Sequence, residues 1–241
     1  MHTVLRLLQA HRVPAVFDLE GTLVDLEMLH FLSFERTLGE MDVDMTVKEI
    51  TALQGVVGGG DPFIAALLAK LWGLAAEEIL VCKKKHFALL LEEMTIEARP
   101  GALAFIESLR SARVPIALAS LTPRDRGEDI LHRSGLARMF PRELVLFREN
   151  VQNPKPHPDV YEEAARRLGV SPRAQIVFED SPVGVQAAKA AGSRVVAIPS
   201  PFFHEEERHM RSLREAGADA FFFHWTDLPM FLPIRAKGGS L

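Results

Sequence analysis

The chain has 241 residues, of which 48% are hydrophobic and 25% charged, and its formal net charge is −4. This balance is typical of a globular protein, and the mixed charge gives no argument for nucleic acid or an acidic membrane surface as a partner. The single cysteine excludes an internal disulfide, and no apolar run reaches the roughly 18–20 residues that a membrane span needs. We therefore expect a cytoplasmic protein. The sequence leaves the oligomeric state open, with a monomer favoured over an oligomer.

Six short apolar runs are separated by stretches with the periodicity of helices. The runs cover residues 14–17, 115–119, 143–147, 175–178, 194–198 and 218–223. Helix starts are marked by a polar residue before a proline, as at Ser181-Pro182, while Gly135, Gly169 and Gly192 stand where helices are expected to stop. Buried strands that alternate with helices indicate βαβ units and therefore an α/β fold, a doubly wound parallel sheet.

Residues 26–97 interrupt this alternation because they carry only the pattern of helices. The predicted helices cover residues 26–38, 45–53, 62–72 and 75–94. An all-helical (four-helix) block after the first strand predicts a separate cap domain of residues 25–98, with residues 1–24 and 99–241 forming the core. Helices that only cover one face of the sheet are the alternative interpretation.

Four clusters of chemically active residues fall at or just after the ends of predicted strands, which is the edge where open parallel sheets bind ligands. In the first cluster, Asp18 and Glu20 are followed by Gly21 and Thr22. Asp18 is a candidate metal ligand or a nucleophile toward phosphorus. An Asx-type turn that closes the strand would explain the same residues.

The second and third clusters contain candidates for binding a phosphate. Ser120 follows the run 115–119 and can donate a hydrogen bond to a phosphate oxygen, whereas Thr122, directly before a proline, is expected to cap the next helix. Lys155 lies within Asn-Pro-Lys-Pro-His-Pro, where three prolines predict an extended, rigid segment that presents the lysine to an anion. A proline-rich surface connector is the alternative.

The fourth cluster is the acidic pair Glu179 and Asp180 at the end of a predicted strand. Carboxylates that converge from different strands form the hard oxygen site that Mg²⁺ prefers, so this pair is a candidate metal site. Capping of the following helix by Asp180 is the alternative.

Together and in this order, the four clusters resemble the haloacid dehalogenase superfamily of phosphotransferases, in particular its branch with a helical cap after the first strand. The resemblance runs from Pro14 to Ile198 and includes the return Arg99-Pro100-Gly101 into the core. The segment from Leu23 to His30 is similar to the β-phosphoglucomutase and phosphoglycolate phosphatase group. The resemblance implies a Rossmann-like core with a helical cap, and a phosphoric monoester hydrolase as the activity.

The resemblance also implies roles for individual residues. Asp18 is the expected nucleophile, which carries an aspartyl-phosphate. Mg²⁺ is expected to bind the Asp18 carboxylate, the backbone carbonyl of Glu20 and Asp180, with Glu179 close by or bridged through water. The residues expected to hold the phosphoryl group are Ser120, Leu121, Lys155 and Thr22.

Glu20 departs from the family pattern, in which an aspartate at this position serves as general acid and base. Glutamate keeps the carboxylate but is one methylene longer, and a positional error near 1 Å can cost about 100-fold in rate. Three outcomes are open. Glu20 does the same work with a shifted cap or backbone, it works slowly and leaves a long-lived phosphoenzyme, or the chain retains only binding of a phosphoanion or a protein partner.

A Mg²⁺-dependent phosphatase for a small phosphorylated metabolite is expected, with a β-phosphoglucomutase-like phosphomutase as the alternative. Related mutases hold a second phosphate with one basic residue in the cap loop and another after the serine motif. Here residues 55–61 contain no cation, and Arg124 is displaced from the second position. The lack of a cation in this loop and the displacement of Arg124 both favour the phosphatase over the mutase.

Two further cap residues are candidates for substrate contact. Lys84 lies in the cationic run Lys83-Lys84-Lys85-His86, which is otherwise typical of a solvated helix face. His30, on the first predicted cap helix, lines the cleft in one interpretation and is a buried structural histidine in the other.

Overall fold

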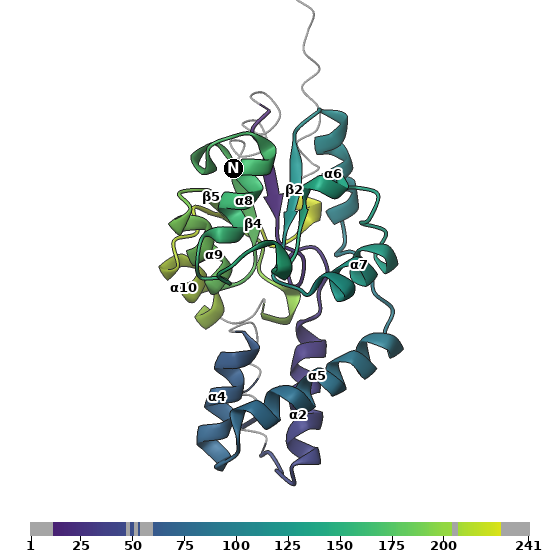
Figure 1. The fold of residues 1–241 in the computed structure, drawn as a ribbon, viewed down its shortest axis with the longest axis vertical. Coiled ribbons are helices and arrows are strands. Elements are labelled where there is room, and N and C mark those ends of the chain that lie inside the picture. Colours follow the sequence, from purple (N-terminus) through teal and green to yellow (C-terminus); the bar gives the residue numbers. More distant parts are fainter. Residues whose placement is uncertain (1–11, 47–48, 51–52, 54–59, 204–206, 228–241) are drawn as a thin grey trace, which may run out of the picture.

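A computed structural model describes residues 12–46, 49–50, 53, 60–203 and 207–227 (Figure 1). The six predicted strands are confirmed as one parallel sheet with the order β3-β2-β1-β4-β5-β6. Their bounds are β1 Ala15–Phe17, β2 Ile116–Ala119, β3 Val145–Leu146, β4 Ile176–Glu179, β5 Arg194–Ala197 and β6 Ala220–Phe221. The strands are shorter than the apolar runs, because the ends of several runs continue into turns and loops.

Helices cover both faces of this sheet, as a doubly wound fold requires. The core helices are α6 Ala102–Ser111, α7 Arg124–Arg133, α8 Asp159–Leu168, α9 Pro182–Ala190 and α10 Glu207–Glu215. Short 3₁₀ turns lie at Arg142–Leu144, Arg148–Asn150, Pro172–Ala174, Pro201–Phe203 and Trp225–Asp227. None of the helices among the described residues is long and apolar enough to cross a membrane.

Successive residues of the central strands point to opposite faces and fill two different parts of the core. Phe17 and Phe178 stack with their ring centroids 4.9 Å apart on one face. Val16 and Val177, their neighbours in sequence, belong to the hydrophobic cluster of the other face, together with Tyr161. The near-continuous apolar runs in the sequence follow from this burial on both faces.

The pairing register brings the ends of the central strands to one edge. Phe17 of β1 is paired with Leu118 of β2 and with Phe178 of β4. The chain after β1, β2 and β4 therefore leaves the sheet at the same edge, where Asp18, Ser120 and Asp180 follow.

The cap helices are α2 Glu27–Glu40, α4 Asp61–Trp72 and α5 Ala76–Glu93. They pack around their own hydrophobic cluster, which includes Phe34, Leu38, Ile64 and Leu68. In Figure 1 they gather beyond one end of the sheet and leave its faces to the core helices. Of the predicted helix 45–53, Glu49, Ile50 and Leu53 are helical, while 47–48 and 51–52 lie outside the described residues. We propose residues 25–98 as the cap domain.

Candidate active site

A cavity of about 320 Å³ lies between the carboxyl ends of the strands and the cap helices. The predicted site residues that line it are Asp18, Glu20, His30, Ser120, Leu121, Lys155 and Asp180. Three others, Thr22, Lys84 and Glu179, are not part of its lining. The cap side is completed by residues of α2 and α4, among them Glu27 and Asp61.

Asp18 lies at the floor of the cavity, in contact with a lysine. Its backbone N–H donates to the carbonyl of Phe178 at 3.0 Å, which keeps the residue in line with the sheet. Lys155 Nζ lies 2.6 Å from Asp18 Oδ1 and 2.6 Å from Glu179 Oε1. The segment around Lys155 is a turn with a cis Lys155–Pro156 bond, so the expectation of an extended segment is wrong.

Glu179 is fully buried behind Lys155 and positions it. Its Oε1 accepts hydrogen bonds from Lys155 and from the Tyr161 hydroxyl, and its Oε2 accepts from the backbone N–H groups of Asp180 and Ser181. Both oxygens are therefore occupied by protein donors. A Cβ at Gly184 would lie 1.6 Å from Glu179 Oε1, so α9 can approach this carboxylate only with a glycine. The structure thus places Glu179 beside the lysine and outside the lining of the cavity.

Thr22 also supports the site from behind. It has no exposed surface, and its hydroxyl donates to Asp180 Oδ1 at 2.7 Å instead of facing a phosphate. Gly21 has a φ of +82°, and a Cβ there would lie 2.0 Å from Asp180 Oδ2, so glycine permits the close approach of the two segments. Arg99 fixes the same loop by donating to the carbonyl of Gly21 at 2.6 Å and of Pro199 at 2.9 Å.

The carboxyl groups at the floor are buried, and the nearby cations do not keep their pKa values in the usual range. Burial raises the pKa of Asp18 to about 7 although Lys155 opposes the shift, and the neighbouring Glu179 adds to it. Burial also raises the pKa of Asp180 well above its usual range, with Glu179 and Glu27 contributing. Buried carboxyl oxygens in this electrostatic setting are the donors that a hard divalent cation takes, so the residues present fit Mg²⁺.

Glu20 is held by partners from α7, from the segment before it and from the cap helix α2. Thr122 Oγ1 donates to Glu20 Oε1 at 2.5 Å, Arg126 Nη2 lies 3.1 Å from the same oxygen, and His30 Nε2 lies 2.9 Å from Oε2. Burial alone would raise the pKa of Glu20, but Arg126 and His30 outweigh it and lower the pKa to about 2. Glu20 is therefore ionised in this arrangement.

Thr122 does not cap the helix that follows it, so that expectation is corrected. Helix α7 begins at Arg124 without a side-chain cap, and the Thr122 hydroxyl is used by Glu20 and by Ser120, whose Oγ lies 2.9 Å away. Since Thr122 donates to the carboxylate, Ser120 is the donor to Thr122. The longer side chain of Glu20 brings its carboxylate within reach of this hydroxyl.

A polar cluster in the cap faces Glu20. Lys83 is only 1% exposed, and its Nζ lies 2.7 Å from Asp61 Oδ2 and 2.8 Å from His30 Nδ1. Hydrogen bonds to Asp61 and Glu20 raise the pKa of His30 against the effects of burial and of Lys83. The neighbouring Lys84 is exposed and does not reach the cavity. Lys83 does not line the cavity either, but it supports the cavity residues His30 and Asp61 from behind.

Four residues of the site were missed by the sequence analysis: Glu27, Asp61, Arg126 and Tyr161. Arg126 lies over the ring of Phe87 at 4.7 Å and enters the cavity, whereas the guanidinium of Arg124 points away to Glu128 and Asn150. Spacing along α7 could have suggested Arg126, which lies two residues beyond Arg124. No comparable signal marks Asp61, because its position depends on how α4 packs against the other cap helices.

A family model for haloacid dehalogenase-like hydrolases matches residues 15–192. Among curated relatives, the phosphorylated carbohydrates phosphatase of Thermotoga maritima is 33% identical over 209 residues, which are 85% of this chain and 91% of that protein. The fructose-1-phosphate phosphatase YqaB of Escherichia coli is 28% identical over 184 residues, or 76% of this chain and 94% of that protein.

Solved structures agree with these matches. CbbY from Rhodobacter sphaeroides, in complex with xylulose-(1,5)bisphosphate, is 27% identical with a TM-score of 0.69, over 90% of this chain and 96% of that one. A hydrolase from Deinococcus radiodurans with bound phosphate and sodium is also 27% identical, with a TM-score of 0.72 over 90% and 93% of the two chains. The ordered motifs, the capped α/β fold and these likenesses lead to one conclusion: the chain belongs to the haloacid dehalogenase-like hydrolase family.

Proposed function

We propose that this chain is a Mg²⁺-dependent phosphatase that hydrolyses a small phosphorylated carbohydrate through an aspartyl-phosphate on Asp18. The observation that carries the proposal is the meeting of Asp18, Lys155 and Asp180 at the floor of one cavity that the cap covers. The substrate class is supported by the names of the relatives from Thermotoga maritima and Escherichia coli.

The residues around Asp18 supply the charge and the donors that phosphoryl transfer needs. Lys155 and the Ser120 hydroxyl bind phosphoryl oxygens, and Glu179 with Tyr161 keeps the lysine in place. Asp18, the Glu20 backbone carbonyl and Asp180 would hold Mg²⁺, and the bound cation would offset the repulsion between the attacking carboxylate and the phosphate dianion. Electrostatic placement of this kind supplies most of the rate enhancement in such reactions.

Glu20 is the acid and base of the proposed mechanism. A carboxylate with a pKa near 2 exchanges protons poorly at neutral pH, so Arg126 and His30, the partners that lower its pKa most, must loosen during turnover while Thr122 keeps its hydrogen bond. An anionic substrate that draws Arg126 or His30 toward itself raises the pKa of Glu20, which then takes up a proton from solvent. Glu20 gives this proton to the leaving oxygen and later takes a proton from the water that cleaves the aspartyl-phosphate.

The test is release of phosphate from an aryl phosphate by the native chain, with Mg²⁺ or with excess EDTA, beside the variant Glu20→Asp. We expect Mg²⁺-dependent release by the native chain and a slower Glu20→Asp, because the shorter side chain cannot keep all three of its contacts. Activity in Glu20→Asp alone would instead identify Glu20 as an off switch. If neither the native chain nor Glu20→Asp released phosphate from the aryl phosphate or from a panel of sugar phosphates, the protein would be one that only binds phosphoanions.

A phosphomutase is the second candidate, and Arg126 is the observation that favours it. A mutase must bind a second phosphate, and Arg126 is a cation of the cavity that the sequence analysis did not count. Its pairing with Glu20 leaves it less available, which favours the phosphatase. Conversion of a sugar 1-phosphate into its 6-phosphate isomer, faster than phosphate release, would establish the mutase.

A further inference from the structure

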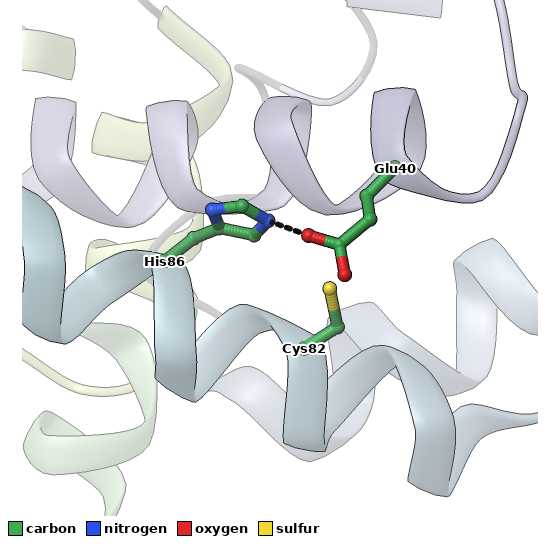
Figure 2. A group of neighbouring side chains, drawn as sticks. All are labelled: Glu40, Cys82 and His86. Carbon is green, nitrogen blue, oxygen red and sulfur yellow. Dashed lines mark hydrogen bonds and ion pairs between the residues drawn. The ribbon is translucent and has the colours of Figure 1, made fainter.

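A second cluster of metal-ligating side chains lies on the cap, away from the cavity (Figure 2). It consists of Glu40, the last residue of α2, with Cys82 and His86 of α5. Their carboxylate, thiol and imidazole atoms all lie within 4.8 Å of one another. Cys82 and His86 are four residues apart and therefore share one face of α5.

The three side chains already point toward one another. Figure 2 shows the Glu40 carboxylate reaching from α2 to the space between the His86 ring and the Cys82 sulfur. His86 Nε2 lies 2.8 Å from Glu40 Oε2, and the ring is only 13% exposed, so its orientation is fixed by packing. Ligand atoms of a tetrahedral zinc site are roughly 3.3–3.8 Å apart. Small rotations of the side chains are enough to reach that geometry.

The surroundings leave room for a fourth ligand and favour a cation. A cavity of about 450 Å³ opens beside the cluster and is lined by Glu77, Glu78, Val81 and Lys85 in addition to Glu40 and Cys82. Glu78 precedes Cys82 by four residues, so it belongs to the same face of α5. Water or Glu78 can complete a tetrahedron, and the acidic groups attract a divalent ion.

One cation now competes for the cluster. Lys85 Nζ lies 3.0 and 2.9 Å from the two oxygens of Glu40, but the lysine side chain is 57% exposed. Exposed ion pairs of this kind contribute little to stability, so a metal can displace the ammonium at small cost.

We propose that Glu40, Cys82 and His86 form a binding site for a thiophilic divalent cation, with Zn²⁺ as the best fit. A thiolate and an imidazole select Zn²⁺ over the hard Mg²⁺ expected at Asp18. Cys82 releases its thiol proton to solvent when the metal–sulfur bond forms. Bound metal ties the end of α2 to the middle of α5, beside Lys83. The proposal does not depend on the phosphatase activity.

Co²⁺ is the first probe, added to EDTA-treated and dialysed protein with Mg²⁺ present throughout to fill the hard site. Because Cys82 is the single cysteine of the sequence, any thiolate-to-cobalt charge-transfer band belongs to it. We expect this band to saturate at one equivalent, to disappear when Zn²⁺ is added and to be absent in Cys82→Ser. Absence of the band in the native protein overturns the proposal.

Variants distinguish Zn²⁺ binding by all three side chains from adventitious binding by the Cys82 thiol alone. We expect Glu40→Gln and His86→Asn each to weaken Zn²⁺ binding at least tenfold, measured by competition with a chelating dye. Lys85→Met should strengthen binding severalfold, because it removes the competing ammonium. Circular dichroism confirms that each variant is folded. Equal affinity in the native protein, Glu40→Gln and His86→Asn would mean binding by the thiol alone, and would overturn the site.

Discussion

The cavity has two walls that are built in different ways. On the core side, Asp18, Ser120 and Asp180 each follow a strand of one parallel sheet. Their convergence is a consequence of topology, because parallel strands in register end at the same edge. On the cap side, the cavity residues His30 and Asp61 come from two helices and are joined from behind by Lys83 of a third, so their meeting depends on how each helix is rotated about its axis.

Lys83 and Lys84 show how much that rotation decides. Adjacent residues of an α-helix point about 100° apart. One lysine is therefore 1% exposed between Asp61 and His30, while its neighbour faces solvent. The chemistry of the core wall follows from the order of strands, whereas that of the cap wall follows from the packing of helices.

The largest expected effect lies on the core wall. Asp18→Asn removes the proposed nucleophile but keeps the size of the side chain and its place beside Lys155. We expect phosphate release to fall by at least about 1000-fold, as when a reacting group is lost from a covalent mechanism. Steady-state assays with Mg²⁺ and trapping of labelled phosphoenzyme measure it. Substantial activity or a phosphoenzyme in Asp18→Asn would show that another residue is the nucleophile.

Replacement of the two lysines tests the cap wall. Lys83→Met leaves Asp61 and His30 without their buried partner, and we expect the free energy of unfolding to fall by about 3 kcal/mol. Lys84→Met, the matched control, should change it by less than about 0.5 kcal/mol because Lys84 is exposed. Urea denaturation of both variants gives the comparison. Equal losses would mean that the orientation of α5 differs from that described.

The sequence was sufficient for the fold and for most of the core wall. Apolar runs and capped helix starts predicted all six strands, and the ordered motifs predicted Asp18, Ser120, Lys155 and Asp180. Asp18, Ser120 and Asp180 follow strand ends, so a linear pattern determines where they lie, whereas Lys155 was recognised from the order of the motifs and lies in a turn before α8.

The partners of Glu20 could not be predicted in the same way. Thr122 was expected to cap a helix, but the extra methylene of Glu20 brings a carboxylate within 2.5 Å of its hydroxyl. Arg126 and His30 reach the same carboxylate from a core helix and a cap helix. Such a contact depends on the position of two domains relative to each other, which no local pattern encodes.

Glu27, the first residue of α2, lines the cavity. Its raised pKa leads us to expect a pH effect of intermediate size on the free energy of unfolding. Burial raises its pKa to about 7, above the value near 4.5 of an unfolded chain. Between these values the folded protein keeps a proton that the unfolded chain loses, so stability falls as pH rises. In Glu27→Gln, which has no carboxyl group at this position, this fall in stability with rising pH is absent. We expect the variant to match the native protein below about pH 4.5 and to exceed it by about 1–2 kcal/mol at pH 7 and above, in EDTA.

Urea denaturation across pH 4–8 measures this difference. The exposed Glu92→Gln of α5 serves as the control for loss of one negative charge. A difference between Glu27→Gln and the native protein that does not change with pH would show that Glu27 is ionised in the fold. Mg²⁺ should narrow the difference, since a cation near Asp180 favours the ionised form of its neighbour Glu27.

The smallest expected effect concerns the hydrogen bond from Thr122 to Glu20, two residues on the core side of the site. Thr122→Val removes one hydrogen bond from an ionised carboxylate, an interaction worth about 1.5 kcal/mol, so kcat/KM should fall roughly tenfold. The pKa of Glu20 should rise because its charged form loses a hydrogen-bond donor. The acidic limb of the pH–rate profile should therefore shift to higher pH. Thr122→Ser keeps the hydroxyl and should stay within about threefold of the native rate. If Thr122→Val and Thr122→Ser gave the same pH–rate profile, the hydroxyl would have no role at Glu20. Arg126 and His30 alone would then hold its carboxylate.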